Sequence, residues 1–102
     1  MPKWLPRVLL RIRELVAQGH VRFTHKANEE LKVLRLDQED GLEIIAGLAD
    51  EDFASRLTSQ ATGEWMYVFK PSLGHACVYV KLVLRSNCIV VSFHEDQNHE
   101  DE

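Results

Sequence analysis

The stretch that decides the fold is HACVYVKLVL (residues 75–84), followed after a short gap by CIVVSFHE (residues 88–95). In both runs apolar and polar side chains alternate with a period of two, which is typical of half-buried antiparallel strands. The gap is short enough for a tight turn, and we expect a hairpin with a two-residue loop at Ser86-Asn87. The two runs therefore predict adjacent strands in an antiparallel sheet.

This hairpin separates two chemically different faces. Its register places Tyr79 opposite His94 and Lys81 opposite Ser92 on one face. The other face is apolar, and its side chains are Ala76, Val78, Val80, Leu82, Leu84, Ile89, Val91 and Phe93. A phenol, an ammonium, a hydroxyl and an imidazole thus gather on the face that the core does not use. We interpret that face as a candidate reaction surface.

The composition limits the chain to one small domain. At 102 residues, of which 45% are hydrophobic, the chain can build one core but not two. The net charge of −4 is uneven, because five of the sixteen acidic residues lie in the final eight positions. We therefore expect a nearly neutral domain over residues 1–94 and an acidic tail over residues 95–102. We interpret the tail as a solvated terminus, with competition against an anionic ligand as the alternative.

Compartment and redox state follow from the same composition. No apolar run approaches the ~20 residues of a membrane span, and arginines interrupt the apolar positions near the N-terminus. We therefore expect a cytoplasmic protein with no membrane partner. In the hairpin, Cys77 and Cys88 fall about 25 Å apart at ~3.3 Å per residue, which is too far for a disulfide bond.

Helical periodicity dominates the first half of the chain. Helices are expected over residues 6–18, 24–34 and 37–47. Thr24 and Asp37 are suitable N-caps for the second and third of them, and the segment HVRF (residues 20–23) reads as an extended connection. From Phe53 onward the period is two, and strands are expected over residues 53–59, 64–70, 78–85 and 88–94. This order predicts an α+β domain with about three helices packed on one face of an antiparallel sheet.

Four segments carry a resemblance to a known family. They are GLADEDFASRLTS (residues 47–59), EWMYVFKP (64–71), VYVKL (78–82) and IVVSFHE (89–95). In residues and spacing, most of the chain resembles the motility quorum-sensing regulator (MqsR) family of toxins from bacterial toxin–antitoxin pairs. The resemblance implies a RelE-like fold and cleavage of messenger RNA without a metal ion or other cofactor. It also implies an antitoxin, expected from the adjacent gene and of helix-turn-helix type, through which alone the toxin would reach DNA.

The resemblance also implies which residues form the active site. Tyr79 falls on the family's active-site tyrosine, and Lys81 on a lysine commonly found two residues later. The family's active-site lysine after the last strand is His94 here. An earlier lysine and a glutamine of the family are replaced by Ser55 and Met66.

Arg56 follows the position of the missing lysine and could replace it. In a regular strand its side chain would point to the opposite face from that of Ser55. Arg56 could therefore reach the phosphate only if a β-bulge re-aims it.

The chemistry of RNA cleavage assigns a role to each of these groups. Cleavage without a metal needs a base for the 2′-hydroxyl, cationic donors for the phosphorane and an acid for the departing 5′-oxygen. Histidine suits proton transfer near neutral pH, so we predict that His94 acts as the acid. Tyr79 could orient the scissile phosphate or the 2′-hydroxyl, and Lys81 could hold the phosphate. The alternative for His94 is a solvated residue at the end of a strand.

Further cationic residues could bind the RNA backbone. His25 and Lys26 follow a helix cap, where the helix dipole favours an anion, and Arg22 lies a short segment before them. We predict phosphate or RNA contacts for these three residues, for Arg56 and for Ser92. The alternative for His25 and Lys26 is an ordinary polar first turn.

Other functional sites are poorly supported. His94 and His99 have no cysteine pair near them, which argues against a structural zinc site, and the chain contains neither a glycine-rich phosphate loop nor a nucleophile elbow. Trp65, Tyr67 and Phe69 alternate on the expected core side, which favours packing over base stacking.

Three functional hypotheses follow. The preferred one is a metal-independent endoribonuclease that is the toxin of a type II pair and leaves a 2′,3′-cyclic phosphate. A catalytically weak module of the same fold, binding RNA or an antitoxin without cutting, is favoured by Ser55 and Met66. A DNA-associated structural partner has little electrostatic support from a nearly neutral domain.

Overall fold

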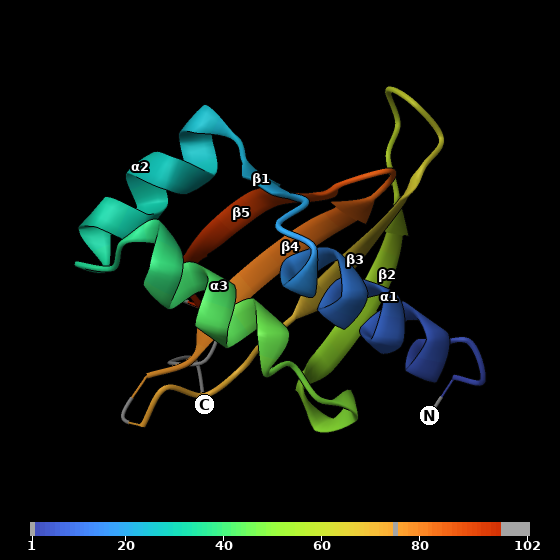
Figure 1. The fold of residues 1–102 in the computed structure, drawn as a ribbon, viewed down its shortest axis with the longest axis horizontal. Helices are drawn as coiled ribbons and strands as arrows, with labels where there is room; N and C mark the ends of the chain where they lie inside the picture. Colours follow the sequence, from blue (N-terminus) through green and yellow to red (C-terminus); the bar gives the residue numbers. More distant parts are fainter. Residues whose placement is uncertain (1, 75, 97–102) are drawn as a thin grey trace.

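The computed structural model describes residues 2–74 and 76–96, which form a five-stranded sheet with helices packed against it. The helical elements are α1 (Leu5–Ala17), α2 (His25–Val33), α3 (Gln38–Ala46) and the 3₁₀ turn η1 (Asp50–Asp52). The strands are β1 (Val21–Phe23), β2 (Phe53–Thr58), β3 (Trp65–Phe69), β4 (Val78–Leu84) and β5 (Cys88–Glu95). The strand order is β1-β5-β4-β3-β2. In Figure 1, α1 and α3 lie in front of the sheet and α2 lies beside β5. The predicted α+β class is confirmed, and we call the face away from α1 and α3 the open face.

The first helix packs an apolar stripe onto the sheet. Pro6 stands in its first turn, where the missing N–H would have no partner in any case. The buried side chains recur at helical spacing and are Leu5, Val8, Leu9, Ile12 and Leu15. After the helix the chain turns at Gly19, whose φ of 76° suits glycine. This face of α1 joins Val80 and Phe93 in the core.

The loop of the β4–β5 hairpin is longer than expected. Leu84 pairs with Cys88, so the loop consists of residues 85–87. The predicted two-residue loop at Ser86-Asn87 is therefore wrong. On its own, the additional residue would shift all later pairing by one position and turn the wrong side chains of β5 toward the core.

A bulge in β5 reverses this shift before the candidate site is reached. Val91 is the additional residue, and the pairs beyond it are Lys81–Ser92, Val80–Phe93 and Tyr79–His94. The predicted pairing of the polar residues is therefore confirmed. Between the loop and the bulge the core face of β5 consists of Cys88 and Val90, where the sequence predicted Ile89 and Val91.

The segment expected as a connection forms β1, a short strand parallel to β5. Where β1 ends, Thr24 continues along the same edge. Its N–H donates to the carbonyl of Val90 (3.0 Å) and its hydroxyl to that of Val91 (3.3 Å). The Thr24 hydroxyl also accepts the N–H of Ala27 (3.1 Å), which caps α2. Two backbone carbonyls at the edge of β5, those of Val90 and Val91, thereby accept hydrogen bonds from Thr24. The same contacts fix the first turn of α2 beside the open face.

The folded part extends further toward the C-terminus than expected. β5 includes Glu95, and Asp96 is 7% exposed. Both residues were assigned to the acidic tail, but Glu95 is the last residue of β5 and the side chain of Asp96 is buried. The rest of that tail, His99 included, lies outside the described residues.

The structure also describes the two thiols, the lengths of the helices and the spacing of His, Cys, Asp and Glu side chains. Cys77 and Cys88 are free thiols. In the part of the chain that the structure describes, no helix has the length and hydropathy needed to cross a membrane. Within the same residues, no three His, Cys, Asp or Glu side chains lie close enough to share a metal ion.

Candidate active site

Tyr79 in β4 and His94 in β5 form the centre of the candidate site. They are direct partners in the ladder, and their ring centroids lie 4.9 Å apart with an interplanar angle of 10°. Both side chains are partly exposed. Stacking restricts the rotamers of both rings. The open face therefore presents the phenol and the imidazole together.

His94 has a defined ring orientation. Its Nδ1 lies 2.8 Å from the backbone carbonyl oxygen of Glu95. Because a carbonyl oxygen can only accept, Nδ1 carries the proton of this hydrogen bond. Nε2 is therefore the nitrogen that can exchange a proton with a ligand.

Two lysines lie next to this stack. Lys81 is partly exposed and faces Ser92 across the ladder. Lys26, in the first turn of α2, donates from Nζ to the Oγ of Ser92 (2.8 Å). Ser92 is only 2% exposed, so its hydroxyl orients Lys26. The phosphate contact predicted for Ser92 stays a prediction, and in this structure its hydroxyl is turned to Lys26.

Glu30, which the sequence reasoning missed, holds Lys26 from the other side. Its Oε2 lies 3.3 Å from the Nζ of Lys26, and its Oε1 accepts the backbone N–H of Phe93 (2.8 Å). The i,i+4 spacing of Lys26 and Glu30 on a helix was a signal for the first contact. The second contact depends on how α2 docks on β5, which periodicity does not report.

Lys70 and Asp96 form a further missed pair. The Nζ of Lys70 lies 3.4 Å from an Oδ2 of Asp96. Lys70 directly follows Phe69, which pairs with Val80, so Lys70 comes opposite Tyr79. Alternation along β3 could have placed Lys70 on the open face. Its partner was not foreseen because Asp96 was assigned to the tail.

Arg56 lies on the helix-covered face of the sheet. It pairs with Tyr67, and its guanidinium stands 4.1 Å from the ring centroid of Trp4 and 3.6 Å from that of Trp65. The register of β2 does shift before Ser55, but the shift does not turn Arg56 to the open face. The structure thus places Arg56 in a double cation–π contact, on the other side of the sheet from the stacked rings.

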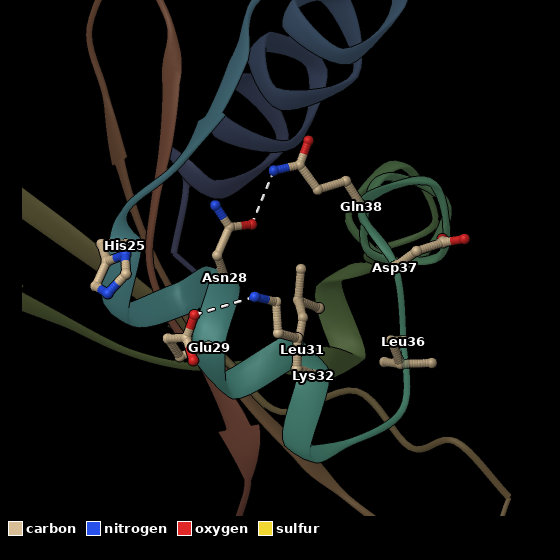
Figure 2. A pocket seen from close by; sticks show the side chains of 8 residues that line it. All are labelled: His25, Asn28, Glu29, Leu31, Lys32, Leu36, Asp37 and Gln38. Carbon is tan, nitrogen blue, oxygen red and sulfur yellow. Dashed lines mark hydrogen bonds and ion pairs between the residues drawn. The ribbon is translucent and has the colours of Figure 1, made fainter.

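His25 opens onto a different part of the surface. It lines a groove of about 470 Å³ between α2 and α3 (Figure 2). Across this groove, the side-chain amide of Gln38 donates to that of Asn28 (2.8 Å). Lys26, the next residue, turns to Ser92 instead. Of the two predicted first-turn residues, only Lys26 therefore joins the site.

Comparison with known proteins agrees with the resemblance noted in the sequence. The family model described as "Motility quorum-sensing regulator, toxin of MqsA" matches residues 6–95. The chain belongs to the MqsR family. A curated relative, the mRNA interferase toxin MqsR of Escherichia coli (strain K12), is 32% identical over 97 residues, which cover 93% of this chain and 99% of the relative.

Away from the stacked rings, the open face of this MqsR-family chain carries a serine and a methionine where the family has a lysine and a glutamine. Ser55 and Met66, the two replaced family positions, continue the sheet rows that contain Lys81 and Val83. Arg22 is exposed at the far edge of the sheet on β1. The ammonium groups are therefore concentrated at the end of the face that holds the stacked rings.

Proposed function

We propose that this chain is the toxin of a type II toxin–antitoxin pair and cleaves messenger RNA as an endoribonuclease. Membership of the MqsR family supports the toxin class, and a relative named as an mRNA interferase supports the substrate. The observation that carries the proposal is the stack of Tyr79 on His94, with Nε2 left to exchange a proton. A proton donor beside a phenol and ammonium groups supplies the acid and the cationic donors that metal-independent cleavage needs.

In the proposed reaction the 2′-hydroxyl of one nucleotide loses its proton to a solvent water and attacks the adjacent phosphorus. The bond to the 5′-oxygen of the next nucleotide breaks, and His94 gives that oxygen a proton from Nε2. The products are a 2′,3′-cyclic phosphate and a 5′-hydroxyl end. Histidine is matched to this step because it can be protonated and still release a proton near neutral pH.

The remaining side chains orient the substrate and stabilise charge. The phenolic O–H of Tyr79 orients the scissile phosphate or the attacking hydroxyl. Lys81 and Lys26 bring positive charge to the phosphorane, where negative charge accumulates. Lys26 is held by Ser92 and Glu30 before RNA binds, so little reorganisation is needed.

An antitoxin is the second proposed partner. The matched family is described as the toxin of MqsA, which supports control by a protein inhibitor. We expect this antitoxin to be encoded by the adjacent gene and to carry a helix-turn-helix. The toxin would then act in the cytoplasm on mRNA and reach DNA only through the antitoxin.

A catalytically weak module that binds RNA or antitoxin remains the alternative function. Ser55 and Met66 favour it, because they stand where the family has the ammonium of a lysine and the amide of a glutamine. A wild-type protein that binds RNA but leaves it intact would support this alternative.

The proposed mechanism can be tested with purified protein and single-stranded RNA in excess EDTA. We expect cleavage with and without the chelator, and mass spectrometry should identify 2′,3′-cyclic phosphate ends. The same RNA with 2′-O-methyl groups should stay intact, because it has no attacking hydroxyl. Inhibition by EDTA, or products with 5′-phosphate ends, would refute the mechanism.

A further inference from the structure

The ion pair of Lys70 and Asp96 lies at the end of the open face. The distance from Nζ to Oδ2 is 3.4 Å, and the two side chains are 35% and 7% exposed. The backbone N–H of Asp96 donates to the carbonyl of Cys77 (2.9 Å), which fixes the carboxylate on the extension of β5. A buried carboxylate thus holds an ammonium that still reaches solvent.

The pair borders the stacked rings. Lys70 follows the end of β3 and comes opposite Tyr79, and Asp96 stands two residues beyond His94, just past the end of β5. Side chains two apart on a strand share a face. The side chain of Lys70 therefore crosses the open face close to Tyr79, on the side away from α2.

A second lysine is held in the same way on the α2 side. Lys26 is paired with Glu30, and their side chains are 62% and 21% exposed. In both pairs the carboxylate is the more buried partner and the ammonium the more exposed one. An ammonium has three donors, and one carboxylate contact leaves others available to a ligand. The stacked rings are thus flanked by two oriented lysines.

Solvation energetics argue against a purely structural role for the pair. Burying a carboxylate costs solvation energy, which one partly exposed ammonium offsets only in part. Exposed ion pairs contribute little to stability. What the pair does provide is a fixed position for the Lys70 ammonium, and a fixed ammonium is useful for binding a phosphate.

We propose that Lys70 is a phosphate-binding residue of the RNA site and that Asp96 is its positioning residue. The proposal rests on the proposed function. Single-stranded RNA carries one phosphate per nucleotide, so a scissile phosphate at Tyr79 and His94 has neighbours on both sides. Lys70 would bind the neighbouring phosphate on the β3 side.

The first test measures binding of an uncleavable RNA as a function of salt. The probe is a fluorescein-labelled 2′-O-methyl RNA of mixed sequence and about a dozen nucleotides, a length within the range of single-strand sites. Lys70→Ala should weaken binding about 10-fold. It should also lower the slope of log affinity against log salt by about 0.7, the value for one lost phosphate contact on a single strand. Lys70→Arg should restore most of the slope.

The matched control is the Lys32–Glu29 pair on α2, with an Nζ to Oε2 distance of 3.2 Å. Lys32→Ala removes the same charge from an ion pair whose two side chains are both exposed, and it should leave the salt slope at the wild-type value. An equal slope for wild type and Lys70→Ala would overturn the phosphate contact.

The positioning role of Asp96 is tested by a double-mutant cycle on kcat/KM for RNA cleavage. Asp96→Asn should lower kcat/KM in the wild-type background and have no further effect in Lys70→Ala. Glu29→Gln, the control for the change in charge, should not lower it. Equal losses from Asp96→Asn with and without Lys70 would overturn the positioning role.

The two proposals fail in distinguishable ways. If the wild-type protein cuts no RNA, the proposed function is wrong whatever the salt slopes show. If wild type cuts RNA and Lys70→Ala has the wild-type slope and kcat/KM, the cleavage function stands and only the role of Lys70 is refuted.

Discussion

Cys77 and Cys88 carry the same thiol in different surroundings. Cys88 is fully buried, and this burial raises its pKa to about 12, whereas Cys77 is partly exposed. The thiolate is the reactive form. One thiol per folded molecule should therefore react quickly with a chromogenic disulfide reagent at about pH 8, and the second only after unfolding. Cys77→Ala should abolish the fast phase, and rapid reaction of two thiols in the folded protein would contradict the burial of Cys88.

At the same scale, strand alternation predicted the central residues of the site but not those that support them. Tyr79 and His94 come together because they face each other in one hairpin. Lys70 and Asp96 lie just beyond the ends of β3 and β5. Alternation of apolar and polar residues does not show where a strand ends, so it did not place them. Glu30 depends on how a helix docks against a strand edge, which is a tertiary feature that no local pattern encodes.

At the scale of single elements, the stacked Arg56 joins the start of α1 to the β2–β3 hairpin. Its guanidinium lies between Trp4 and Trp65, and each cation–π contact contributes about 0.5–1 kcal/mol at a partly exposed site. Arg56→Ala should therefore lower the free energy of unfolding by about 1–2 kcal/mol in urea titrations. Its RNA cleavage should equal that of wild type, because the side chain lies on the helix-covered face. A large loss of cleavage with unchanged stability would restore the phosphate contact that the sequence suggested.

A second contact between elements joins the β2–β3 turn to the β4–β5 loop. Arg85 donates to both carboxylate oxygens of Glu64, at 2.7 and 2.6 Å. This hydrogen bonding lowers the pKa of Glu64 from 4.5 to about 2. The contribution to stability is therefore complete above pH 4.5 and is lost as the pH falls toward about 2.

The Glu64→Gln variant tests this linkage. Near neutral pH its Tm should be lower than that of wild type. The difference between the two Tm values should shrink as the pH falls from about 4.5 to about 2. Thermal scans followed by circular dichroism would measure it. A Tm difference that does not change over this range would show that the ion pair does not stabilise the fold.

The elements themselves differ in how far their sequence predicts them. Long periodic segments such as α1 were predicted within one residue at each end. β1 was missed because three residues are too few to show a period. The three-residue loop and the Val91 bulge were missed together, since each reverses the other's effect on the register of the polar residues.

At the scale of the whole molecule, the site joins parts that are distant in the chain. Lys26 comes from α2, and its partner Ser92 comes from β5, 66 positions later. Lys70 comes from the end of β3. The candidate site therefore exists only in the folded chain. In the proposed function, a partner that displaces α2 or covers the open face would block RNA cleavage.

This arrangement gives a cellular prediction for the antitoxin. Expression of the chain alone should arrest growth, and co-expression with the product of the adjacent gene should relieve the arrest and yield a stable complex. Growth curves and co-purification measure both effects. Unimpaired growth without a partner would instead favour the catalytically weak module.

Comparing RNA turnover by wild type, His94→Ala and His20→Ala tests the central claim most directly. His20 is exposed and lies before β1, so its replacement controls for the loss of an imidazole. We expect His94→Ala to lower turnover by about 10²–10⁴-fold, the usual contribution of one positioned acid, with little change in affinity for 2′-O-methyl RNA. His20→Ala should match wild type. Equal turnover by wild type and His94→Ala, with both folded by circular dichroism, would contradict the assignment of His94 as the acid.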